Sequence, residues 1–100
     1  MMDVTVNQGE AGAVIKLVGR FDFNAHREFR DSVERAIGHK ADVSVDLGEV
    51  SYLDSSALGM LLMLRDKVKS EGHQVRLVNA RGSVRQVLDI ANFGKLFAIS

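Results

Sequence analysis

The sequence predicts an α/β fold in which helices pack on a mixed sheet of about four strands. Two observations lead to this prediction. The chain begins with two short stretches of strand character separated by a glycine-containing turn, and after them strands and helical stretches alternate. A β-hairpin should therefore open the sheet, and the later strands should pair in parallel through right-handed βαβ crossovers.

The opening hairpin is predicted from residues 2–6 and 13–18. Residues 2–6 alternate weakly between apolar and polar side chains, and residues 13–18 (AVIKLV) are typical of a strand. The segment Gly9-Glu10-Ala11-Gly12 between them supplies turn residues. The two strands are thus expected to pair antiparallel.

A first helix is expected from Asn24 to about Ile37. Asparagine is a good N-cap residue, and Gly38 should end the helix. Phe21 and Phe23 precede it, and one of them should lie in the core while the other lies at the surface. The apolar residues that share one face of this helix are Ala25, Phe29, Val33, Ala36 and Ile37.

The second half of the chain repeats this alternation. Residues 43–47 are predicted to form a strand, residues 55–70 a helix closed by Gly72, and residues 74–78 another strand. Ser83 should cap a third helix, whose apolar residues at helical spacing are Val84, Val87, Leu88 and Ala91. Residues 92–94 should stop it, and the tail at 96–99 fits either a short strand or packed coil.

The helix over residues 55–70 should have a buried side and an outward side. At 100° per residue, one direction gathers Ala57, Leu61, Leu64 and Val68, flanked by Leu58 and Met60. The outward side carries Gly59, Leu62, Met63 and Asp66. Leu62 and Met63 then belong to a docking surface, or they are partly buried under a neighbouring loop. The residues expected to be mostly buried in the whole domain are Val14, Ile15, Leu17, Val43, Val45, Leu47, Leu61, Leu64, Val75, Leu77 and Leu88.

Composition limits the classes of protein to which the chain can belong. One hundred residues, 46% of them hydrophobic, suffice for the core of one domain, predicted to span residues 1–100. Thirteen basic residues balance thirteen acidic ones, so no strong overall field attracts nucleic acid or an anionic membrane. The absence of cysteine excludes disulfides and suits a cytoplasmic protein. Neither a signal peptide nor a membrane span is recognisable.

The segment Asp54-Ser55-Ser56 lies at the start of the second predicted helix. The first N–H groups of a helix lack internal partners and the macrodipole favours an anion there, so added negative charge is tolerated. Asp and Ser are also preferred N-cap residues. Capping by Asp54 is compatible with a serine hydroxyl that carries phosphate.

The sequence resembles the STAS domain, the fold of bacterial anti-sigma factor antagonists, over almost its whole length. Residues 53–59 (LDSSALG) are similar to the family's Asp-Ser-Ser-Gly-Leu-Gly signature, with Ala57 in place of a glycine. Residues 17–22 (LVGRFD) are similar to the segment before the family's first helix. The resemblance implies the STAS fold.

The resemblance also implies roles for individual residues. The first serine of the signature is the one that the family phosphorylates, which assigns phosphorylation to Ser55 and leaves Ser56 to the helix start. Asp22 matches a residue near the phosphorylated serine and is expected to help shape the partner surface. The full set of expected partner-binding residues is Asp22, Asp54, Ser56, Gly59, Leu62, Met63 and Asp66.

The function implied by the family is that of an anti-sigma factor antagonist in the cytoplasm. When Ser55 is unphosphorylated, such a protein binds an anti-sigma factor or serine kinase switch protein and so releases a sigma factor. Phosphorylation ends binding, and a PP2C-type phosphatase restores it. The free protein is expected to be a monomer. The alternative is a STAS accessory subunit that docks on the ATPase of an ABC-type lipid or solute transporter.

Catalysis and cofactor or metal binding have little support in the sequence. A serine hydrolase would need a base near its nucleophile, but G-x-S-x-G is missing and His26, His39 and His73 fall on or beside helix ends. These histidines also lack metal-ligand spacing. Neither a P-loop nor a Rossmann fingerprint occurs, and nucleic-acid binding is not expected because the basic residues are spread along the chain.

Overall fold

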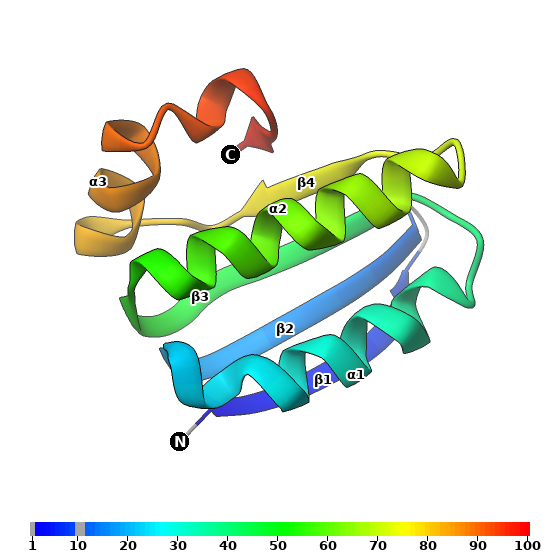
Figure 1. Cartoon of the computed structure of the whole chain (residues 1–100), viewed down its shortest axis with the longest axis horizontal. Helices are drawn as coiled ribbons and strands as arrows, with labels where there is room; N and C mark the ends of the chain where they lie inside the picture. The colour runs from blue at the N-terminus through cyan, green and yellow to red at the C-terminus, as the bar shows by residue number, and fades with distance from the viewer. Residues whose placement is uncertain (1, 10–11) are drawn as a thin grey trace.

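The computed structural model describes residues 2–9 and 12–100, which form a five-stranded sheet and three α-helices (Figure 1). The strands are β1 (Met2–Gly9), β2 (Gly12–Phe21), β3 (Val43–Leu53), β4 (Val75–Val78) and β5 (Ala98–Ile99). The helices are α1 (His26–Ile37), α2 (Ser55–Ser70) and α3 (Gly82–Ile90), and short 3-10 turns, η1 (Phe23–Ala25) and η2 (Phe93–Lys95), come before α1 and β5.

The sheet follows the order of the chain, β1-β2-β3-β4-β5. β1 and β2 are antiparallel, and β2 to β5 pair in parallel. The predicted hairpin and βαβ units are therefore confirmed. Gly9 and Gly12 are paired at the end of the hairpin, while Glu10 and Ala11 of the predicted turn lie outside the described residues. The tail forms a fifth strand, one more than predicted, because its backbone bonds to the free edge of β4.

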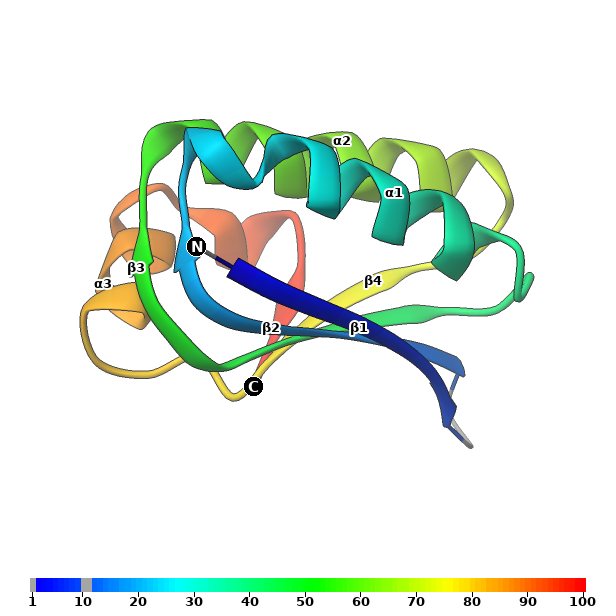
Figure 2. The same cartoon turned by 90° about the horizontal axis from the view of Figure 1, so that it is seen from below.

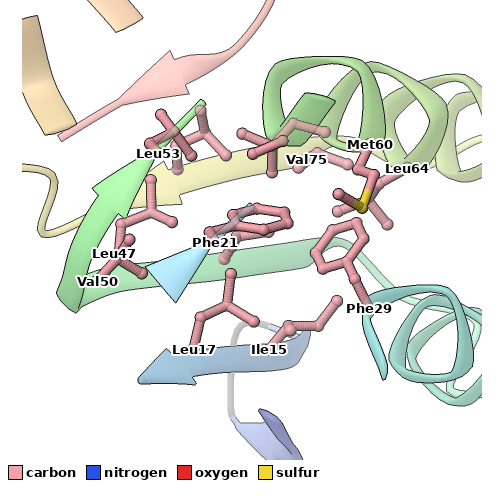
Figure 3. Close-up of a cluster of buried hydrophobic side chains, with 14 of the residues drawn as sticks. Ile15, Leu17, Phe21, Phe29, Leu47, Val50, Leu53, Met60, Leu64 and Val75 are labelled. Atoms are coloured by element: carbon pink, nitrogen blue, oxygen red, sulfur yellow. The ribbon is translucent and has the colours of Figure 1, made fainter. Parts of the chain in front are cut away.

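Both α1 and α2 lie on the same face of the sheet (Figure 2). Beneath them, Phe21 of β2 and Phe29 of α1 are fully buried with ring centroids 4.9 Å apart (Figure 3). Each fully buried side chain of this size stabilises the fold by about 1.5–3 kcal/mol. The predicted core is confirmed except at Val14, which is half-buried because it alternates away from the helices between Ala13 and Ile15.

β3 is longer than predicted and ends at Leu53 instead of Leu47. β2 is extended as well, so the two strands stay paired up to Phe21 and Leu53 despite two register shifts. Val50 and Leu53 are buried and stabilise the extension. The carboxyl ends of β2 and β3 consequently lie next to each other.

The prediction that Asn24 caps the first helix is wrong. Asp22 is extended, and its Oδ1 accepts a hydrogen bond from the Asn24 backbone N–H at 3.0 Å. Asn24 therefore lies inside η1, and α1 follows from His26 without a side-chain cap. The buried side of the helix is the predicted one, with Ile37 half-buried at its edge and Ala25, Phe29, Val33 and Ala36 buried.

Ser83 is not the N-cap of the third helix, so that prediction is also wrong. α3 begins at Gly82, whose φ is 59°, and Arg81 occupies the cap position without a side-chain cap bond. The Arg81 guanidinium instead donates a hydrogen bond to the Gly48 carbonyl at 2.8 Å. This contact ties the start of α3 to β3.

The predicted second helix is confirmed with the same limits, Ser55–Ser70. Gly72 has a φ of 82°, as expected of a glycine that closes a helix. No helix in the described part of the chain combines the length and the apolar character that crossing a membrane requires.

Candidate functional site

Two aspartates that are far apart in the sequence start helical turns side by side. Phe21 and Leu53 are register partners at the ends of β2 and β3, so Asp22 and Asp54 follow at the same edge of the sheet. The Asp54 backbone N–H donates to the Phe21 carbonyl at 3.4 Å, which joins the two loops. The carboxyl ends of parallel strands are a common place for binding sites in α/β folds.

Asp54 caps α2, as predicted. Its backbone is extended, with φ −111° and ψ −177°, and its Oδ1 accepts a hydrogen bond from the Ala57 backbone N–H at 3.0 Å. The same oxygen accepts a second bond from the Ser56 hydroxyl at 2.6 Å. Ser56 is half-buried, so its hydroxyl is committed to the start of the helix.

These bonds change the acidity of the cap. The Ser56 hydroxyl, followed by backbone N–H groups of Ala57, Phe23 and Ser56, holds the pKa of Asp54 below its ordinary value, while partial burial acts in the opposite direction. Hydrogen bonds to the charged form outweigh its desolvation. Asp54 therefore stays ionised and keeps Ser56 as a donor at neutral pH.

Ser55 differs from its neighbour. It is the first residue of α2, its side chain is exposed, and it has no side-chain hydrogen bond within the described residues. Its position at the positive end of a 16-residue helix tolerates an anion. Of the two serines, Ser55 thus presents the hydroxyl that another protein can reach.

The remaining outward positions of α2 do not gather at one place. Gly59 is exposed one turn after Ser55, and a Cβ atom there would meet nothing within 4 Å. Asp66 is exposed but lies about 16 Å farther along the helix than Ser55. Its carboxylate approaches the Arg65 guanidinium at 3.6 Å. The structure therefore brings Gly59, but not Asp66, near the serine pair.

Leu62 and Met63 are less accessible than an outward helix face suggests. Both are half-buried and pack against the core. Lys67 Nζ lies 2.9 Å from Glu34 Oε1 of α1, so Met63, one turn before Lys67, lies on the side of α2 that faces α1. Leu62 lies 100° farther round the helix. Both side chains are therefore half-buried and not fully exposed, and their assignment to a partner surface stays a prediction.

Three side chains near the site were missed or left open by the sequence. Arg20 lies over the Tyr52 ring at 4.3 Å and approaches Asp22 at 3.5 Å. The contact between Arg20 and Tyr52 follows from the β2–β3 register, which aligns these two residues. It was missed because β3 was predicted to end at Leu47 and not at Leu53. One of Phe21 and Phe23 was expected to lie in the core and the other at the surface. The structure shows that Phe21 is buried and Phe23 is 72% exposed.

The side chains gathered at the two helix starts are carboxylates, hydroxyls and an exposed aromatic ring. Among residues 2–9 and 12–100, no group of three or more His, Cys, Asp or Glu side chains is arranged to hold a metal ion. The arrangement offers an accessible hydroxyl at a helix start and a partly apolar surface beside it.

The chain belongs to the STAS-domain family, whose model, described as Mlab, STAS domain, matches residues 4–98. A STAS-domain containing protein of Pseudomonas aeruginosa is 51% identical over 86 residues, which cover 86% of this chain and 85% of that protein. The anti-sigma-B factor antagonist of Bacillus subtilis is 26% identical over 99 residues, which cover 99% of this chain and 91% of that protein.

Solved structures confirm the fold. An anti-sigma factor antagonist from Mycobacterium paratuberculosis matches with a TM-score of 0.87 at 20% identity, over 99% of this chain and 85% of that chain. The Bacillus cell fate determinant SpoIIAA in its phosphorylated form matches with a TM-score of 0.73 at 21% identity, over 98% of this chain and 91% of that chain. The STAS fold implied by residues 53–59 and 17–22 is therefore the observed one.

Proposed function

We propose that this chain is an anti-sigma factor antagonist that binds its partner when Ser55 is unphosphorylated. The observation that carries the proposal is the difference between two adjacent serines. Ser55 is exposed without a side-chain bond, whereas Ser56 donates to Asp54 at 2.6 Å. The Bacillus subtilis relative is an anti-sigma-B factor antagonist, and SpoIIAA, a structural relative, is known in a phosphorylated form.

The proposed partner is an anti-sigma factor or a serine kinase switch protein, and its capture releases a sigma factor. Phosphorylation of Ser55 by the kinase ends the complex, and a PP2C-type phosphatase restores it. In this proposal the chain works in the cytoplasm as a non-catalytic module, monomeric when free, without cofactor, nucleic acid or membrane insertion. The proposed contact residues centre on Asp22, Asp54, Ser56 and Gly59, with Leu62, Met63 and Asp66 farther along α2.

The physical basis of the switch is charge. Phosphoserine adds about 1.5–2 negative charges. A partner carboxylate at 4 Å would be repelled by about 1 kcal/mol per unit charge in water and by up to about 4 kcal/mol near a protein surface. A hundredfold loss of affinity requires about 2.7 kcal/mol. Because the start of α2 tolerates the anion, phosphorylation should weaken binding more than it weakens the fold.

Phosphorylation mapping tests the modified residue. Incubated with its cognate kinase and ATP, the chain should gain one phosphate, and tryptic mass spectrometry should place it on Ser55. The Ser55→Ala variant should stay unmodified, and the Ser56→Ala variant should still be phosphorylated. Phosphate on Ser56 alone would contradict the proposal.

Affinity capture followed by titration tests the partner. The unphosphorylated chain should retain an anti-sigma factor or switch kinase from a lysate of its own organism, and the purified pair should bind in a titration. Ser55→Ala should bind like the parent and Ser55→Asp more weakly, although one carboxylate supplies about half of the phosphate charge. Capture of a transporter ATPase instead, with Ser55→Asp binding as tightly as the parent, would favour the accessory-subunit function.

A further inference from the structure

Phe23 is an apolar side chain left in water beside the candidate site. It is 72% exposed, although the residues on either side of it are held by the Asp22 turn. The loop that carries it is joined to the start of α2 by the bond between the Asp54 N–H and the Phe21 carbonyl. An exposed aromatic ring on a well-fixed backbone is a typical anchor of a protein interface, since its burial is favourable and costs little conformational entropy.

Basic side chains lie on the α1 side of this ring. An open hollow is lined by Phe23 and Asn24 together with His26, Arg27 and Arg30 at the start of α1. Arg27 and Arg30 are exposed, and neither forms an ion pair with another described residue.

Among the described residues, none of the acidic side chains of α1 forms an ion pair with Arg27 or Arg30. Glu34, one turn after Arg30, pairs with Lys67 of α2. Glu28 lines a different hollow, on the β1 side of the helix. Asp31 is exposed without an ion pair to Arg27. The α1 side of Phe23 therefore presents two arginines without an ion pair to another described residue, while the carboxylates of Asp22 and Asp54 lie at the helix starts on its other side.

The same surface continues onto α2. α1 and α2 lie side by side and run in the same direction (Figure 1), and the Glu34–Lys67 pair sets their relative level. One helical turn before this pair, Arg30 on α1 is level with Met63 on α2. Closer to the starts of the two helices lie Arg27 on α1 and then Phe23, which is beside the serine pair.

We propose that Phe23, Arg27, Arg30 and Met63 form a docking surface for the switch protein, which meets it with an apolar pocket that has carboxylates on the side facing α1. This inference rests on the proposed function and names the chemistry of its partner. Two exposed arginines without an ion pair in the described part of the chain favour carboxylates on the facing part of the partner, because charges of opposite sign steer and orient association. An acidic partner surface over Phe23 is also one that phosphate on Ser55 would repel, so the docking surface accounts for the sign of the switch.

Titration of the purified, unphosphorylated chain with its purified switch protein tests the surface. The double variant Arg27→Glu/Arg30→Glu should lower affinity by about tenfold or more, and the difference from the parent should shrink as salt is raised. Phe23→Ala should lower affinity by about tenfold with little change in salt dependence. Arg35→Glu, an exposed arginine of the same helix away from Phe23, is the matched control and should change affinity less than about twofold. Thermal unfolding of each variant checks that the fold is kept.

The outcomes separate this inference from the function on which it rests. If the parent binds in a Ser55-dependent manner and the double variant binds equally well, or loses no more than Arg35→Glu, the docking surface is wrong and the function stands. If the parent binds no anti-sigma factor or switch kinase, both are wrong. Concentration-dependent dimers of the parent that Phe23→Ala abolishes would assign the surface to a second copy and overturn the inference.

Discussion

The two sides of α2 are subject to different constraints. On the inner side Ala57, Leu61 and Leu64 are completely buried, so their volume is set by the sheet and by α1. On the outer side Ser55 and Gly59 are exposed, and a Cβ atom at Gly59 would meet no neighbour within 4 Å. Substitutions on the inner side should therefore change folding, and substitutions on the outer side should change binding. Four predictions test this division.

The largest effect is expected on the inner side. Leu61→Ala should lower the free energy of unfolding by about 2–5 kcal/mol, because the closely packed core cannot fill the cavity. Leu62→Ala, at a half-buried position on the other side, should cost distinctly less. Urea unfolding measures both variants. Equal losses would show that α2 has no distinct outer side.

The helix start should show a smaller effect. Asp54→Ala removes the acceptor of the Ala57 N–H and of the Ser56 hydroxyl, and loss of an N-cap costs about 0.5–2 kcal/mol. Asp22→Ala is the matched control, since Asp22 caps the three-residue turn η1 and should cost less. If Asp22→Ala lowered stability more than Asp54→Ala in thermal unfolding, the cap at Asp22 would contribute more to the fold than the cap at Asp54.

Gly59 should separate stability from binding directly. Gly59→Ala should stabilise the chain by about 1 kcal/mol, because alanine is the better helix former and the added methyl group meets no neighbour. The same methyl group should weaken partner binding if the partner packs closely on this turn. Urea unfolding and partner titration should change in opposite directions. A loss of stability would mean that the outer side is constrained by contacts within the fold.

Low pH should weaken the Asp54 cap, and this is the smallest of the four predicted effects. The hydrogen bond from Ser56 holds the pKa of Asp54 below its ordinary value of 3.8. A carboxylate with a lowered folded-state pKa contributes stability above its unfolded pKa and loses it as pH falls through the folded pKa. The difference in unfolding free energy between the parent and Asp54→Asn should thus be constant near neutral pH and change below about pH 4. A difference that stays constant down to about pH 2 would contradict the acidity assigned to Asp54.

The part of the candidate site that is formed by residues adjacent in the sequence could be predicted. Asp54, Ser55 and Ser56 are adjacent, so a strand followed by a helix places them at a helix start whatever the rest of the chain does. The contrast between the two serines was not predictable from spacing alone, because the bond between Ser56 and Asp54 depends on side-chain geometry. Arg20 and Tyr52 were missed for a different reason, since their contact requires the register of two strands.

By itself, the sequence determined the order of the elements, the limits of α2 and the buried sides of α1 and α2. These follow from apolar spacing within one segment, which each segment carries without reference to the others. Tertiary structure alone decided that β3 runs to Leu53, that Asp22 rather than Asn24 starts the first helical turn, and that Met63 is half-buried. Each of these depends on a neighbouring element: β3 on its pairing with β2, Asp22 on where β2 ends, and Met63 on the nearness of α1. A contact between two segments that are far apart in the sequence leaves no periodic pattern of apolar residues in either segment. Such a contact is therefore seen only in the packed structure.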